Sequence, residues 1–314
     1  MQLQESSYWP ARFAIYPFAV ILLAAGGLAQ DPQVNLIPRL RPAPERKEAS
    51  LHSDVKMVMI PTNVVGPDDR PILDLQKEDF QLFEGAVEQK ISAFSIDQAP
   101  VSVGIVFDSS GSMKNKIGRS RSAVEQFVKS SLPGDEFFLI QFADLPTLRA
   151  PFTPDGDEIS AAMSLVQPYG WTALHDAIVL AVNQMRQAKN SRKALLVLSD
   201  GGDNHSRYSS SEVIDMLREA DVRLYAIGLF DSARFLKRAA EETGGGVIEV
   251  NDLQKLPDAI DTLSAQLRSQ YLLGYYPVEP QNDGKFHAVK VKLSNAAGRL
   301  KLRASWRHGY YAPY

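Results

Sequence analysis

The sequence predicts an α/β protein with a doubly wound, mostly parallel six-stranded sheet, inserted into a small β-sandwich formed by the N- and C-terminal flanks. Between residues 99 and 270, nearly continuous apolar runs alternate with helical patterns, as expected for parallel strands joined by crossover helices. Two of these runs, 101–108 and 193–200, end in aspartate. On both sides of this region the helical period is missing and short β-rich runs take its place, which predicts that the two flanks pair with each other.

Composition indicates a globular protein and excludes several functions. Of the 314 residues, 45% are hydrophobic and 23% are charged, with a formal net charge of -3 at pH 7. This mildly acidic balance argues against nucleic-acid binding, which normally requires a basic excess. The chain has no cysteine, so disulfides, thiol nucleophiles and cysteine-based metal sites are excluded.

The first 29 residues have the features of a secretory signal peptide. Arg12 precedes the apolar run Phe13–Ala29, which ends in small residues and is followed directly by polar Gln30. Cleavage after Ala29 would send the protein to the periplasm, the cell envelope or the medium, with no membrane span left in the mature chain. The alternative is an uncleaved anchor, because the run reaches the lower limit of about 17 residues for a bilayer span.

The expected organisation after the signal peptide (1–29) has four parts. A proline-rich linker (30–48) leads to an N-terminal β-strand flank (49–98), the α/β domain (99–270) and a C-terminal β-strand flank (271–314).

The runs within these parts predict the strands and helices, and the run 75–96 contains a turn between short strands. In the N-terminal flank the β-rich runs are 55–65 and 75–96. In the α/β domain, strands are expected at 101–108, 137–142, 147–152, 193–200, 223–230 and 247–250, with helices at 113–132, 157–166, 173–188, 211–220, 234–243 and 256–270. In the C-terminal flank, a turn at 295–298 predicts that strands 286–293 and 300–306 form a hairpin.

Oxygen-bearing side chains gather where strands of the predicted sheet end. Asp108 ends one strand and is followed on a tight loop by Ser110 and Ser112, Thr172 opens a helix, and Asp200 ends a second strand. Ligands of open α/β sheets bind at the carboxyl ends of the strands. Because hydroxyl and carboxylate oxygens are the ligands of hard divalent cations, this pattern predicts a metal site.

These residues resemble the metal-ion-dependent adhesion site of von Willebrand factor A domains. The pattern Asp-x-Ser-x-Ser stands at 108–112, followed in order by Thr172 and Asp200. The resemblance covers about 99–270 and implies a Rossmann-like sheet with strand order 3-2-1-4-5-6. The flanks are similar to those of secreted bacterial proteins of the von Willebrand factor A-related class, which supports the architecture more than a function.

The resemblance also implies how each residue acts. Ser110 and Ser112 would bind the cation directly, Thr172 would do so in the ligand-bound form, and Asp108 and Asp200 would act mainly through water. The cation would be Mg²⁺, or Mn²⁺ or Ca²⁺, with an open position for an Asp or Glu carboxylate of a protein partner. This implies an exported, non-enzymatic module for adhesion or assembly.

Three alternatives compete with that function. The serine-rich loop at 108–112 could serve only as a helix cap. The metal could stabilise a structural scaffold without binding any partner. Asp108 could be the nucleophile of an Mg²⁺-dependent phosphoryl hydrolase. The last is disfavoured because Ser110 stands where such enzymes usually need an acid/base aspartate, and no catalytic residue is predicted.

Residues next to the motif are candidates for a partner-binding rim. Trp171, His175 and His205 lie within a few positions of Thr172 or Asp200, although ordinary packing or loop roles compete for each. Asp203 and Asn204 are expected to satisfy the loop backbone rather than to bind metal.

The signal peptide is tested by the mass of the exported chain. Because small residues precede Gln30, mass spectrometry of the exported protein is expected to find Gln30 at the mature N-terminus. Retention of Met1 would contradict cleavage and favour the anchor.

Overall fold

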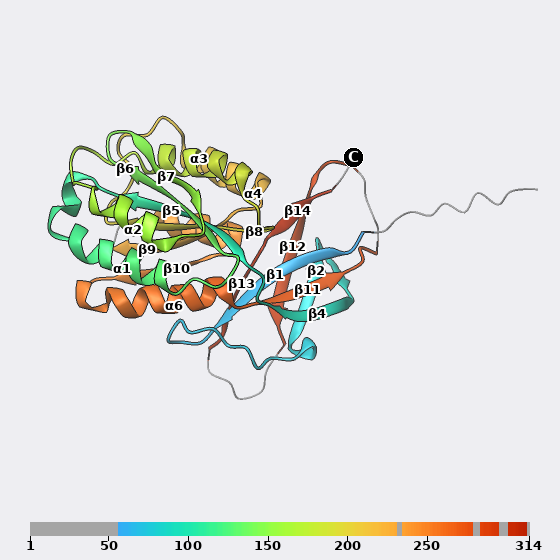
Figure 1. The fold of residues 1–314 in the computed structure, drawn as a ribbon. Coiled ribbons are helices and arrows are strands. Elements are labelled where there is room, and N and C mark those ends of the chain that lie inside the picture. Colours follow the sequence, from blue (N-terminus) through green and yellow to red (C-terminus); the bar gives the residue numbers. More distant parts are fainter. Residues whose placement is uncertain (1–55, 231–233, 279–282, 295–300, 313–314) are drawn as a thin grey trace, which may run out of the picture. The chain divides into compact units, whose positions relative to one another are not determined.

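Figure 1 shows the computed structural model of the chain, which describes residues 56–230, 234–278, 283–294 and 301–312. The signal peptide and the proline-rich linker lie outside the described residues, as does the expected turn at 295–298.

A six-stranded sheet forms the centre of the α/β region. Its strands, in spatial order, are β10 (Gly246–Val250), β9 (Arg223–Leu229), β8 (Arg192–Ser199), β5 (Val101–Asp108), β6 (Glu136–Phe142) and β7 (Pro146–Thr153). All neighbours pair in parallel except β6 and β7, which are antiparallel. Numbered within this region, the order is 3-2-1-4-5-6, so the predicted doubly wound topology is confirmed.

Helices cover both faces of this sheet (Figure 1). In the described part of the chain they are α1 (Ile117–Lys129), α2 (Gly156–Ser164), α3 (Leu174–Gln184), α4 (Ser210–Glu219), α5 (Arg234–Thr243) and α6 (Leu256–Arg268). Side chains of β5 alternate between two buried clusters, because successive residues of a strand point to opposite faces. Ile105 and Phe107 pack in the cluster with α1 and α6, whereas Val106 packs in the cluster with α3 and α4. No helix among the described residues is long and apolar enough to cross a membrane.

The first helix starts later than the sequence pattern predicts. Residues Gly111–Asn115 form a 3-10 turn, and α1 begins only at Ile117. The turn places Met113 in the core, so an apolar residue that fits the helical spacing is buried without being helical.

The two flanks form two further sheets. One has the order β13 (Arg303–Trp306), β1 (Val58–Val65), β11 (Gln270–Tyr275), β4 (Ile91–Asp97), and the other has the order β14 (Gly309–Tyr311), β12 (Phe286–Leu293), β2 (Phe80–Glu84), β3 (Val87–Gln89). Strands from both ends of the chain pair within each sheet, and Figure 1 shows blue β1 beside orange β11. Ile60 and Tyr271 from the first sheet share one buried cluster with Leu82 and Val291 from the second. The predicted β-sandwich is therefore confirmed.

The expected hairpin between the last long strands is wrong. Strand β12 pairs with β14 and β2, whereas β13 pairs with β1 in the opposite sheet. The backbone of β1 at Thr62–Val65 offers β13 a free edge, and Trp306 of β13 donates its ring N–H across the sandwich to the Val289 carbonyl (2.9 Å). Alternating apolar residues predict a strand but do not show which sheet it joins.

A polar cluster around Glu84 joins the two sheets of the sandwich. Its carboxylate accepts hydrogen bonds from the hydroxyls of Tyr275 (2.7 Å) and Tyr310 (3.3 Å) and contacts Nδ1 of His287 (2.9 Å). Nε2 of His287 lies 3.1 Å from Asp283 Oδ1. Burial lowers the pKa of His287, but the hydrogen bonds and charges of Asp283 and Glu84 outweigh it and raise the pKa above its ordinary value.

This cluster predicts a pH-dependent stability. The pKa of His287 is higher in the folded protein than in the unfolded chain, where it is about 6.5. Protonated His287 therefore adds to the free energy of unfolding below pH 6.5, and this contribution is lost as the pH rises through the folded-state pKa. The substitution His287→Gln should therefore lower the free energy of unfolding by about 1 kcal/mol more at pH 5.5 than at pH 8.5, as measured by urea unfolding. The matched control is His205→Gln, at an exposed position. Equal losses at both pH values would contradict the prediction.

Candidate metal centre

The loops that carry the predicted site residues are locked together by backbone hydrogen bonds. Tyr169 N–H donates to the Ser109 carbonyl (2.8 Å), and Gly111 N–H donates to the Gly170 carbonyl (3.0 Å). These bonds join the loop after β5 to the segment before α3 at the carboxyl edge of the sheet.

Asp108 lies buried at the bottom of the site. It ends β5 and is fully buried. Its Oδ1 accepts from the Ser110 N–H (2.8 Å), and its Oδ2 accepts from the Ser199 hydroxyl (2.5 Å). Burial raises the pKa of Asp108, the hydrogen bonds from Ser110 and Ser199 lower it, and the charge of Asp200 raises it, with a net rise. Because a donor contacts each carboxylate oxygen, Asp108 fixes the shape of the loop.

Ser112 connects the first motif to Asp200. The hydroxyl oxygens of Ser110 and Ser112 lie 3.1 Å apart, and the Ser112 hydroxyl donates to Asp200 Oδ1 (2.7 Å). The Asp200 side chain is 0% exposed, and its Oδ2 pairs with the ammonium of Lys116. The sequence does not mark Lys116 as part of the site, because nothing in the spacing of a single lysine near a helix start indicates its partner.

Thr172 lies on the loop before α3, close to the residue that follows Asp200. Its N–H donates to the Asn204 side-chain oxygen (2.9 Å), and its carbonyl accepts from the Asn204 N–H (3.0 Å). A β-carbon on Gly201 would lie 3.7 Å from the Thr172 hydroxyl oxygen, so this hydroxyl faces the residue next to Asp200. The expectation that Asn204 satisfies loop backbone is confirmed.

The donor set fits a hard divalent cation. Two ligands at right angles on an octahedral Mg²⁺, each about 2.1 Å from it, lie about 3.0 Å apart. The hydroxyl oxygens of Ser110 and Ser112 have nearly this separation. Among the described residues, no group of three His, Cys, Asp or Glu could hold a metal, so a cation at this edge would depend on hydroxyl oxygens.

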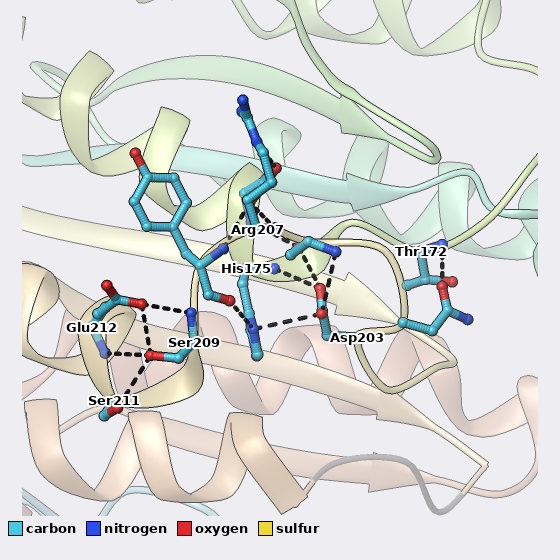
Figure 2. Close-up of polar contacts among 11 residues, drawn as sticks. Thr172, His175, Asp203, Arg207, Ser209, Ser211 and Glu212 are labelled. Carbon is cyan, nitrogen blue, oxygen red and sulfur yellow. Dashed lines mark hydrogen bonds and ion pairs between the residues drawn. The ribbon is translucent and has the colours of Figure 1, made fainter.

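The loop after β8 is tied to the start of α3 by a second polar network (Figure 2). Asp203 accepts from the His175 N–H (3.1 Å) and from the Ser206 hydroxyl, as expected for a residue that satisfies the loop. The His175 side chain is 12% exposed, and its Nδ1 contacts the Tyr208 carbonyl (2.9 Å). His175 thus lies within the loop contacts, while His205 is exposed and Trp171 is 62% exposed beside Thr172.

A known family matches the part of the chain that carries the candidate centre. Residues 103–202 match the family model described as von Willebrand factor type A domain, and this stretch includes the whole candidate centre. The chain carries a von Willebrand factor type A domain. A solved von Willebrand factor type A structure from Catenulispora acidiphila, 14% identical, covers 83% of this chain and 75% of its own with a TM-score of 0.51, which shows the shared fold.

Two other relatives match the chain less completely. Proximal thread matrix protein 1 from the mussel byssus was solved with zinc in its metal-ion-dependent adhesion site (MIDAS) motif. It is 20% identical and has a TM-score of 0.48, and the match covers 57% of this chain and 49% of the mussel protein. An uncharacterized protein of Borreliella burgdorferi is 24% identical over 147 residues, 44% of this chain and 43% of the relative. The chain thus spans less than half the length of either relative.

Two aspartates that sequence reasoning missed position loops of the von Willebrand factor A domain. Asp144, two residues after the end of β6, accepts from the Trp171 N–H (2.6 Å). The preceding Gly170 has a φ of +65°, and a β-carbon there would lie 2.4 Å from the Asp144 carboxylate. Asp176, in the first turn of α3, accepts from the N–H groups of Arg207 (2.9 Å) and Tyr208 (3.3 Å). Both roles depend on contacts between loops, which a lone aspartate in the sequence does not reveal.

Removal of the Asp176 carboxylate should loosen the loop after β8. The substitution Asp176→Ala leaves two backbone N–H groups without their acceptor, so we expect a loss of about 1–3 kcal/mol in the free energy of unfolding, measured by urea unfolding. The control is Asp215→Ala, because that carboxylate is largely exposed and its ion pair is with Arg218 on the same helix. Equal stability of the two variants would contradict the role of Asp176.

Proposed function

We propose that the von Willebrand factor A domain binds a divalent cation, Mg²⁺ or else Mn²⁺ or Ca²⁺, and through it an Asp or Glu carboxylate of a protein partner. The observation that carries the proposal is the convergence of the Ser110 and Ser112 hydroxyls, 3.1 Å apart, beside the buried carboxylates of Asp108 and Asp200. When bound, the cation would supply a positive centre with a coordination position for an acidic ligand.

The proposed ligands differ in charge, and this difference favours an acidic partner. Ser110, Ser112 and Thr172 would hold the cation through neutral hydroxyls. Asp108 and Asp200 would balance the charge of the cation mainly through water, and donors already hold both oxygens of Asp108. Neutral direct ligands leave more of the cation's charge available to the partner than carboxylate ligands would.

Exposed apolar side chains around the centre support a protein partner. Trp171, Tyr169 and Leu145 are all exposed, and they lie on the loops that surround Thr172 and Asp144. Aromatic side chains at the centre of an interface supply much of its binding energy. A partner would thus offer a carboxylate with apolar neighbours.

A hydrolase fits the geometry less well. A nucleophilic Asp108 would need an accessible oxygen, but the residue is fully buried and both oxygens accept hydrogen bonds. We therefore propose a non-enzymatic module for adhesion or assembly, exported to the cell surface or envelope by the apolar segment at its N-terminus.

Metal binding is tested with the full chain by isothermal titration calorimetry with Mg²⁺. The substitutions Ser112→Ala and Asp200→Asn should each weaken Mg²⁺ binding at least about tenfold, because one removes a ligand and the other a balancing charge. Ser164→Ala, an exposed serine on α2, is the matched control and should bind as the wild type does. Unchanged affinity in both site variants would refute the metal centre.

Partner binding is tested by a pull-down from the native cell envelope, with Mg²⁺ or with chelator. Loss of the captured protein with chelator and with Ser112→Ala supports adhesion through the cation. A scaffold whose metal only stabilises the loops gives a different result: chelator lowers the melting temperature but leaves capture unchanged.

A further inference from the structure

Lys116 is a third charged group of the metal centre, and the family motif does not include it. It stands between the 3-10 turn Gly111–Asn115 and the start of α1, so the backbone that carries Ser112 also positions its side chain. The ammonium pairs with Oδ2 of Asp200, and the lysine side chain is only 22% exposed. The ammonium also lies over the ring of Phe230, with 5.0 Å between Nζ and the ring centroid.

This ion pair changes the charge of the centre. Asp108 and Asp200 would alone give two negative charges, and Lys116 reduces the total to one. A divalent cation then makes the occupied centre positive by one unit, and a partner carboxylate neutralises it. Without the lysine, the occupied centre would already be neutral, and an incoming carboxylate would make it negative.

We propose that Lys116 sets the balance between the two ligands of this centre: it weakens binding of the divalent cation and strengthens binding of the acidic partner to the occupied site. The inference rests on the proposed function. Its physical basis is that charges a few ångströms apart in a partly buried site interact strongly. The ammonium repels the cation and attracts the incoming carboxylate, so its effects on the two binding steps have opposite signs.

The experiment uses Mn²⁺ as the probe metal and acetate as the probe carboxylate, with the full chain. Water-proton relaxation reports Mn²⁺ binding, and its decrease on addition of acetate reports displacement of water from the bound ion. The test variant is Lys116→Met, which keeps an unbranched side chain of similar length and removes its positive charge. The control, Lys114→Met, loses the same charge from an exposed lysine in the adjacent 3-10 turn. Lys116→Arg retains the charge.

We expect Lys116→Met to bind Mn²⁺ about tenfold more tightly than the wild type. The Mn²⁺-bound variant should bind acetate at least about threefold more weakly than the Mn²⁺-bound wild type. Lys114→Met and Lys116→Arg should stay close to the wild type in both measurements. Lys116→Gln provides a second neutral variant if Lys116→Met does not give the wild-type circular dichroism spectrum.

The outcomes separate the two proposals. If the wild type binds no divalent cation, the proposed function fails and this inference fails with it. If the wild type binds Mn²⁺ but the neutral variants match Lys114→Met, the role of Lys116 is refuted and the metal centre stands. Tighter binding of both Mn²⁺ and acetate in Lys116→Met would also refute it, because the charge argument requires opposite changes.

Discussion

The pairing of β5 with β8 is the interaction on which the rest of the site depends. All eight residues of β5 are buried, and the strand lies between β6, the next strand of the sheet along the chain, and β8, which follows only after β7. The order of strands reverses there, and ligands of open α/β sheets bind at the carboxyl ends of the strands at such a point. Parallel register sets Phe107 opposite Leu198, so the next residues, Asp108 and Ser199, meet through a hydrogen bond. Each loop of the candidate centre begins from this pair of strands or is bonded to one that does.

Burial of carboxylates is the cost of this arrangement, and nearby donors offset it. A buried ionised carboxylate is stable only when donors or cations replace water. Asp108 has donors on both oxygens, Asp200 has Ser112 and Lys116, and Asp176 has the backbone of the loop after β8. These bonds also order the loops before any ligand arrives. A preorganised site of this kind loses less conformational entropy on binding.

Patterns within short stretches predicted most of the fold, and contacts between distant residues account for what they missed. The apolar runs at β5 and β8 and their terminal aspartates are local features, so the parallel sheet and the candidate ligands follow from sequence patterns, while the strand order came from the family resemblance. Lys116 and Asp200 are 84 positions apart and share no pattern, so their ion pair emerges only when the loops meet. The sheet that β13 joins likewise depends on the open edge of β1.

The interleaving of the flanks constrains the order in which the chain can fold. In its sheet β1 has β11 on one side and β13 on the other, and both come from the far end of the chain. During synthesis or export from the N-terminus, β1 therefore stays without β11 and β13 until the intervening α/β region has emerged. Closing so long a loop is slow, and an unpaired strand edge invites association with other chains. The α/β region, whose contacts are more local, can form first and bring the two flanks together.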